Sequence, residues 1–121
     1  VGKKIKVTTL DTILENKSMS SFDVIFVKMD LEGYEFEALR GFKNNIIKYN
    51  PIILFEFSRM LVNNKYFSKN VFDSFLKEIS YEIKDHDNNT YSIDQLITKL
   101  DKKDKKFQVL GDYLLIKKNS L

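Results

Sequence analysis

The stretch that decides the fold is residues 23–57, DVIFVKMDLEGYEFEALRGFKNNIIKYNPIILFEF. It contains two apolar runs, VIFV and IILF, which end shortly before or at a carboxylate, Asp30 and Glu56 respectively. Between the runs lies an amphipathic segment of helix length that Pro51 closes. Short apolar runs around such a segment predict a strand–helix–strand unit, with parallel strands and a right-handed crossover.

Each part of this unit has a further local prediction. The run at residues 23–29 has β-branched and aromatic residues at its centre, which predicts a strand buried on both faces of a parallel sheet. The helix after it carries an apolar stripe and acidic residues at its amino end, as the helix dipole favours. Gly41 interrupts the middle of that helix and predicts a kink or a break.

The rest of the chain supplies the other elements. The patterns predict a strand at 3–8, a short helix from Leu10 capped by Thr9 or Asp11, an irregular loop at 58–70, a helix at 71–79, a strand at 81–83, a helix at 92–100, a charged turn at 101–106, and a last strand at 107–116 with a bulge or bend at Gly111 and Asp112. This order predicts an α/β fold with helices on both faces of a mostly parallel sheet and an antiparallel last strand.

Bulk properties limit the class of protein. At 121 residues we expect a single domain over 1–121. The absence of Cys excludes disulfides and thiol chemistry, and His86, the single His, lies in a polar turn where we expect it to be solvated. The net charge of +3 is small, and lysines alternate with acidic residues along the chain, so we expect no nucleic-acid partner. We expect the lysines of 99–106 to lie in a solvated turn rather than in a phosphate site.

Without a secretory signal or an apolar run of roughly 20 residues, we expect a cytoplasmic chain with no membrane span. A first residue other than Met suggests an internal piece or a processed product.

Three carboxylates are the candidate reactive groups. Asp30 ends one predicted strand, Glu32 follows two residues later, and Glu56 nearly ends the neighbouring strand. Neighbouring strands lie about 4.8 Å apart, so we expect Asp30 and Glu56 to approach each other at the edge where ligands bind in open α/β sheets. Such a pair binds a hard cation such as Mg²⁺ or shares a proton as acid and base. The alternative is structural: Glu32 caps the helix and interacts with its dipole, the other two lie at a solvated strand end, and Gly33 serves a tight turn.

These residues also carry a resemblance. The string Val27-Lys28-Met29-Asp30-Leu31-Glu32-Gly33-Tyr34-Glu35, continued by Leu39-Arg40-Gly41, Pro51 and Glu56 and preceded by Val7-Thr8-Thr9-Leu10-Asp11, resembles the FkbM-type S-adenosylmethionine-dependent methyltransferases. The resemblance covers residues 5–57. It implies a Rossmann-like class I methyltransferase fold, a three-layer sandwich, and S-adenosylmethionine as cofactor with transfer to a hydroxyl group.

The resemblance covers only part of that fold. The family's Gly-rich cofactor loop and the acidic residue that takes the ribose hydroxyls lie in an earlier half, and this sequence has no G-x-G. The chain therefore resembles the carboxyl-terminal half of the domain. We expect this fragment to bind S-adenosylmethionine poorly and to be inactive alone.

The resemblance also implies roles for residues of the site. Asp30, Glu32 and Glu56 would be catalytic, with a divalent cation at Asp30 and Glu56 as an option. Lys28 and Tyr34 would border the acceptor, a small-molecule, glycan or lipid hydroxyl. Each of these two has a structural alternative: a salt bridge of Lys28 to Glu32 or Glu56, and a core position for Tyr34.

Two other functions compete with methyl transfer. One is a non-catalytic truncated half that docks on another chain, or on its own missing half, through an exposed sheet edge, which also permits self-association. The other is a metal-dependent hydrolase that uses Asp30 and Glu56, although no third ligand stands at metal spacing.

Overall fold

The computed structural model describes residues 2–103, 106 and 108–119. In this part of the chain, the elements are α1 (Leu10–Leu14), β1 (Phe26–Met29), α2 (Glu35–Arg40), α3 (Lys43–Tyr49), β2 (Ile52–Ser58), α4 (Arg59–Asn63), α5 (Lys69–Ile79), β3 (Tyr81–Lys84), β4 (Thr90–Tyr91), α6 (Ile93–Lys102) and β5 (Val109–Lys117).

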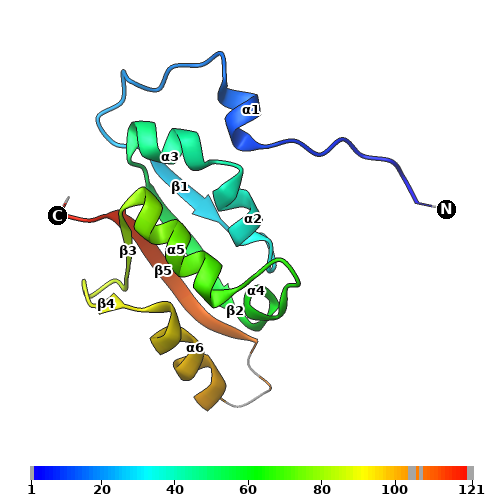
Figure 1. Cartoon of the computed structure of the whole chain (residues 1–121), viewed down its shortest axis with the longest axis vertical. Coiled ribbons are helices and arrows are strands. Elements are labelled where there is room, and N and C mark those ends of the chain that lie inside the picture. Colours follow the sequence, from blue (N-terminus) through cyan, green and yellow to red (C-terminus); the bar gives the residue numbers. More distant parts are fainter. Residues whose placement is uncertain (1, 104–105, 107, 120–121) are drawn as a thin grey trace.

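The described strands form one sheet in the order β1-β2-β5-β3-β4 (Figure 1). β1 and β2 are parallel, and the three other neighbouring pairs are antiparallel. The parallel strand–helix–strand unit and the antiparallel last strand are therefore confirmed, but the mostly parallel sheet is wrong. The reason is that β5 enters between β2 and β3. Although β3 runs in the same direction as β2, it has no parallel neighbour.

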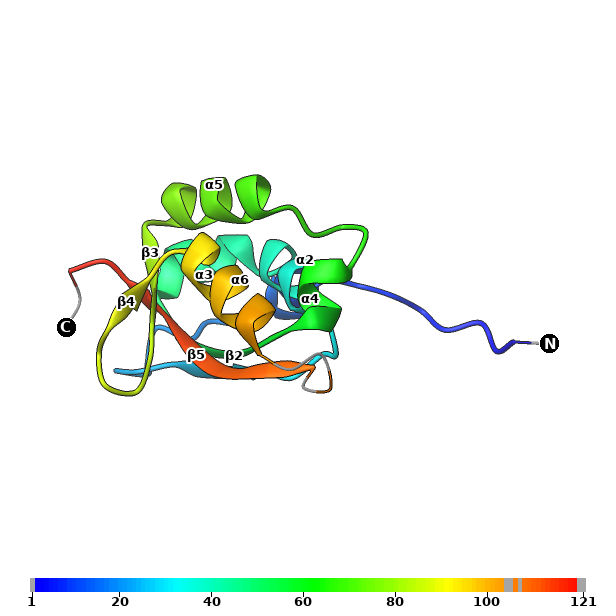
Figure 2. The same cartoon turned by 90° about the horizontal axis from the view of Figure 1, so that it is seen from below.

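The helices lie over one face of the sheet, as the view from below shows (Figure 2). The described chain thus has two layers, so the predicted helices on both faces and the three-layer sandwich are wrong for this part of the chain. The alternation along β2 fits this arrangement, because Ile53, Phe55 and Phe57 are fully buried under the helices. The residues that alternate with them, Ile52, Leu54 and Glu56, are only partly buried.

Aromatic rings fill the space between the sheet and the helices. Phe36 of α2 lies 5.1 Å from Phe72 of α5, and Phe72 lies 6.3 Å from Phe55 of β2, measured between ring centroids. Such tilted contacts add to the free energy gained by burying the rings. The helical layer is therefore fixed to the sheet around β2, the strand that carries Glu56.

β1 is shorter and more exposed than predicted. It begins at Phe26 rather than at residue 23, and Val24 and Phe26 are 69% and 57% exposed. The prediction of a strand buried on both faces is wrong, because β1 is an edge strand of a sheet that has helices on one side. Lys28 shares the exposed face, since its register partner in β2 is the outward Leu54.

The segment before β1 also differs from the prediction. Residues 3–8 form no strand and extend away from the body of the molecule (Figure 1), with Ile5 and Val7 more than three-quarters exposed. The short helix after them is confirmed as α1. Thr9 caps it, because its Oγ1 accepts a hydrogen bond from the Thr12 backbone N–H.

The helix between the two parallel strands breaks at Gly41, as predicted. α2 ends at Arg40 and α3 begins at Lys43. Asp11 explains how α3 restarts, since its carboxylate accepts the backbone N–H groups of Asn44 and Asn45 at 3.0 and 3.1 Å. Asp11 therefore satisfies donors at the start of a helix more than 30 residues away.

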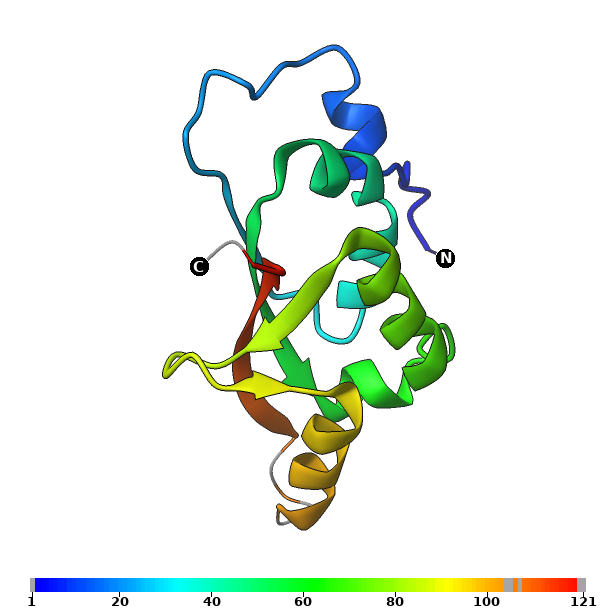
Figure 3. The same cartoon turned by 60° about the vertical axis from the view of Figure 1, so that its left-hand side comes forward.

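The second half follows the predicted order closely. The predicted helices at 71–79 and 92–100 and the strand at 81–83 are present as α5, α6 and β3, and β3 and β4 form a hairpin that leads into α6 (Figure 3). The loop predicted at 58–70 contains α4, which Ser58 caps. The bulge predicted near Gly111 corresponds to a register shift, because Gly111 pairs with Phe57 whereas Val109 pairs with Ser58.

Two features complete the comparison with the sequence. The predicted start of the last strand at Phe107, and positions 104 and 105 of the charged turn, lie outside the described residues. No helix of the described chain is long and apolar enough to cross a membrane.

Candidate functional site

The candidate site lies at the edge of the sheet where β1 and β2 end. Met29, the last residue of β1, pairs with Phe55 of β2. Asp30, directly after β1, and Glu56, the next residue of β2, therefore lie side by side at this edge. Asp112 of β5 pairs with Glu56 from the other side. We call these three residues and Glu32 the carboxylate rim.

Glu56 is the central member of the carboxylate rim. Its neighbours in the strand, Phe55 and Phe57, are buried under the helices, so Glu56 projects toward the uncovered face. Partial burial raises the pKa of Glu56, and the negative charges of Asp30 and Asp112 raise it further, with smaller contributions from Glu35 and Glu32. Glu56 is therefore a carboxylate that takes up a proton more readily than an ordinary Glu.

The turn after β1 brings Glu32 to the same edge. Glu32 has φ 52° and Gly33 has φ 102°, so two successive residues adopt the left-handed region. Glu32 is exposed, and α2 begins at Glu35, with Tyr34 at the N-cap position and no side-chain cap. Glu32 thus does not cap the helix, and the turn directs its side chain outward.

Gly33 also packs against the segment after β2. A Cβ at this position would lie 2.7 Å from the backbone oxygen of Met60, closer than atoms pack. Asn64 fixes the same turn by donating from Nδ2 to the Gly33 carbonyl oxygen at 3.0 Å. The requirement for Gly33 therefore comes from a close approach as well as from φ.

Glu35 is a residue whose role the sequence did not indicate. Its carboxylate is buried and accepts the backbone N–H groups of Leu31 and Gly33, each at 3.0 Å. Charged acceptors make strong hydrogen bonds to backbone amides. A carboxylate two residues after a Glu-Gly turn is the pattern that could have drawn attention to this contact.

Lys28 forms no ion pair with the rim carboxylates among the described residues. It is exposed on the outer face of β1 and makes no ion pair with a described residue, so the predicted salt bridge to Glu32 or Glu56 is not formed. Its position beside Leu54 keeps it on the same face as Glu56. A role for Lys28 in acceptor binding stays a prediction.

Tyr34 stands at the start of α2 and is 58% exposed, so its alternative position in the core is wrong. It lines a cavity of about 460 Å³ between α2 and the segment that leads into α1. Leu31 and Thr9 line the same cavity. None of the rim carboxylates is among the residues that line this cavity, so a role for Tyr34 in acceptor binding stays a prediction.

The possible divalent cation at Asp30 and Glu56 has no third protein ligand among the described residues. Among the described residues, no group of three or more His, Asp or Glu side chains is arranged to hold a metal ion. A cation at Asp30 and Glu56 thus stays a prediction.

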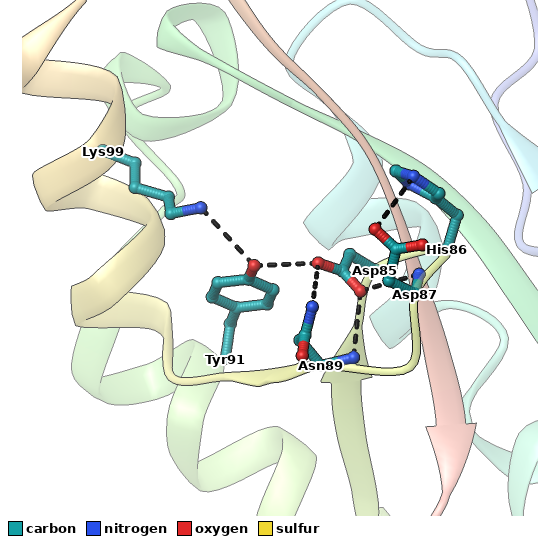
Figure 4. Close-up of polar contacts among 6 residues, drawn as sticks. All are labelled: Asp85, His86, Asp87, Asn89, Tyr91 and Lys99. Atoms are coloured by element: carbon teal, nitrogen blue, oxygen red, sulfur yellow. Dashed lines mark hydrogen bonds and ion pairs between the residues drawn. The ribbon is translucent and has the colours of Figure 1, made fainter.

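A second polar cluster lies after β3 and includes Asp85, Asn89, Tyr91 and Lys99 (Figure 4). Asp85 accepts the Tyr91 hydroxyl at 2.8 Å and the Asn89 backbone N–H at 2.9 Å, and Lys99 lies 3.4 Å from the Tyr91 oxygen. Desolvation raises the pKa of Asp85, but the hydrogen bonds outweigh it and lower the pKa to about 2. His86 is 89% exposed beside Asp87, as expected for a solvated turn. This cluster stabilises the β3–β4 turn.

Comparison with known proteins agrees with the motif at the rim. The model of the methyltransferase FkbM domain family matches residues 1–107, which include Asp30, Glu32 and Glu56 of the carboxylate rim but not Asp112. Comparisons with curated proteins and with solved structures gave no match.

Proposed function

The chain belongs to the FkbM methyltransferase family, and we propose that it uses S-adenosylmethionine to methylate a hydroxyl group. We further propose that it forms the carboxyl-terminal half of such a domain. The observation that carries the proposal is the carboxylate rim, in which the register sets Asp30 beside Glu56 at the end of the parallel pair. The family points to methyl transfer in general, and the rim supports the hydroxyl acceptor.

The charge of the rim suits this cofactor. S-adenosylmethionine, when bound, supplies a methyl group on a positively charged sulfur. Mutual repulsion among Asp30, Glu56 and Asp112 contributes to the raised pKa of Glu56, and a nearby positive charge would relieve that repulsion. The sequence has no Gly-rich loop to hold the nucleoside. The described residues therefore fit the reactive end of the cofactor, and another segment would bind its nucleoside.

Glu56 and Asp30 have complementary tasks in this proposal. Glu56 takes the proton of the acceptor hydroxyl as the oxygen becomes nucleophilic, because its pKa lies above that of an ordinary Glu. Asp30 orients the hydroxyl and attracts positive charge. The body of a small-molecule, glycan or lipid acceptor would contact Lys28, on the same face as Glu56, and Tyr34, just before α2.

The enzyme proposal is tested by transfer of a labelled methyl group from S-adenosylmethionine in the full-length protein. We expect Asp30→Ala to abolish transfer, because it removes a rim carboxylate. Asp73→Ala, a change of the same kind on α5, should leave transfer intact. Unchanged turnover in Asp30→Ala would remove Asp30 from the site.

The half-domain proposal has its own test. Calorimetric titration of S-adenosylmethionine into the 121-residue chain should show no saturable binding in the micromolar range. Saturable micromolar binding would contradict the proposal that the nucleoside-binding half lies outside this chain.

The second candidate is a non-catalytic subunit that associates through its sheet. The outer edge of β1 has no strand partner among the described residues, and Phe26, Ile52 and Leu54 lie on the uncovered face. Unpaired edges and exposed apolar faces favour association. Light scattering tests this candidate: a chain that stays monomeric at high micromolar concentration would argue against self-association.

A further inference from the structure

The turn between β1 and α2 is held by one buried side chain. Glu35 is 1% exposed, and its two carboxylate oxygens accept separate backbone amides, Oε1 from Leu31 and Oε2 from Gly33. Burying a carboxylate is costly unless it is hydrogen-bonded. Because both oxygens are occupied by backbone donors inside the protein, Glu35 is not placed to contact an acceptor.

The turn needs such support because its backbone is unfavourable. Glu32 is a non-glycine residue at φ 52°, a region that L side chains adopt only at a cost in free energy. The two amides that Glu35 accepts, those of Leu31 and Gly33, lie on either side of Glu32 along the chain. Glu35 therefore holds Glu32 from both sides and fixes the backbone directly after Asp30.

A second contact holds the turn from the opposite direction. Asn64 donates to the Gly33 carbonyl oxygen, and Gly33 packs against the backbone of Met60. Both residues belong to the segment that follows β2, the strand of Glu56. The turn after β1 is thus attached to the segment after β2, and Glu35 supplies the acceptors for its N–H groups.

We propose that Glu35 is a positioning residue that holds the turn so that the carboxylates of Asp30 and Glu32 project at the rim beside Glu56. The link from this geometry to methyl transfer rests on the proposed function, whereas the geometry itself does not. A positioning residue of this kind fixes reacting groups before the substrate arrives.

The test uses Glu35→Asp, which keeps the charge but shortens the side chain by one methylene. We expect the backbone amides of Leu31 and Gly33 to exchange with solvent about tenfold faster or more, because a hydrogen bond to a charged group is weakened. Glu15→Asp is the control, since Glu15 is exposed just after α1 and accepts neither amide. Unchanged exchange of the two amides in Glu35→Asp would overturn the proposal.

A second readout separates positioning from simple stabilisation. If Asp30 and Glu32 move away from Glu56 in Glu35→Asp, the pKa of Glu56, followed by its carboxyl carbon in NMR, should fall toward the ordinary value, although no charge is lost. A merely structural role would leave that pKa unchanged while the amides exchange faster. That result would also overturn the proposal.

A measurement on the unaltered chain keeps the test decisive if Glu35→Asp does not fold. The backbone amides of Leu31 and Gly33 should exchange with solvent much more slowly than those of the exposed residues 3–8, because Glu35 accepts both. Equally fast exchange in the two groups would overturn the proposal. Because none of these readouts needs methyl transfer, failure of the proposed function would leave them intact and is recognised separately.

Discussion

Glu56 lies between two other carboxylates, because the register of the sheet sets Asp30 on one side of it and Asp112 on the other. Sequence spacing predicted the neighbour Asp30. Spacing did not indicate Asp112, because its pairing with Glu56 depends on β5 entering the sheet next to β2. It also did not reveal Glu35, whose contacts depend on a turn with two positive φ angles.

The raised pKa of Glu56 makes a prediction about stability. A carboxyl with a raised pKa in the folded state destabilises the protein when ionised. This cost is absent below pH 4.5, the ordinary pKa of a Glu, because the carboxyl is then protonated in both the folded and the unfolded chain. We expect Glu56→Gln to increase the free energy of unfolding at pH 7 by up to about 1 kcal/mol. The gain should disappear when urea unfolding is repeated below pH 4.5. A loss of stability at pH 7 would contradict the repulsion at the rim.

Asp85 makes the opposite prediction. Its pKa of about 2 lies below the ordinary 3.8, so the ionised carboxylate stabilises the fold at any pH above 3.8. We expect Asp85→Asn to lower the urea midpoint at pH 7, with a difference that shrinks as the pH falls from 4 toward 2. Asp87→Asn, in the same turn, is the control. A difference that is independent of pH would contradict the role of the charge.

At the scale of elements, α3 depends on a distant cap. Asp11→Ala removes the acceptor for the backbone N–H groups of Asn44 and Asn45 and should cost about 0.5–2 kcal/mol of stability. Glu15→Ala, an exposed change just after α1, should cost much less. Thermal or urea unfolding compares the two. Equal effects of the two changes would show that Asp11 does not act as a cap.

The turn at Gly33 allows a second prediction for an element. Gly33→Ala places a Cβ against the Met60 backbone at φ 102°, so we expect a loss of about 1–3 kcal/mol. Gly2→Ala is the control, because a Cβ there meets nothing within 4 Å. A variant at Gly33 that unfolds at the same urea concentration as the native chain would contradict the close approach.

Local patterns predicted helices better than strand environments. The break at Gly41 and the start of α6 at Ser92 follow from residues within a few positions. The alternation at residues 3–8 predicted a strand that is absent, because a strand also needs a neighbour that the local pattern does not specify. For the same reason, the apolar run before Met29 gave no sign that β1 lies at an edge.

At the scale of the whole molecule, the uncovered face of the sheet is the main feature. Phe26 is exposed on this face next to Ile52, and we expect Phe26→Lys to reduce self-association without a large change in stability. Val71→Lys, a change at an exposed site on the helical side, is the control. Light scattering over a concentration series measures the effect. Equal association in both variants would show that this face is not the contact.

The order of elements was largely predictable, but their arrangement was not. The two parallel strands are joined by a nearby helix, so a local pattern predicted their pairing. The position of β5 between β2 and β3 pairs residues that are far apart in the sequence, such as Leu115 with Ile53 and Ile83. The sequence also could not show that the helices gather on one face.

The central claim is that Asp30 and Glu56 form one charged site at the end of β1 and β2. The most direct measurement is an NMR titration of the Glu56 carboxyl carbon in the native chain and in Asp30→Asn. We predict that the pKa of Glu56 falls when the Asp30 charge is removed, although burial keeps it above the ordinary value. An unchanged pKa would contradict the claim, because it would mean that the two carboxylates do not share a site.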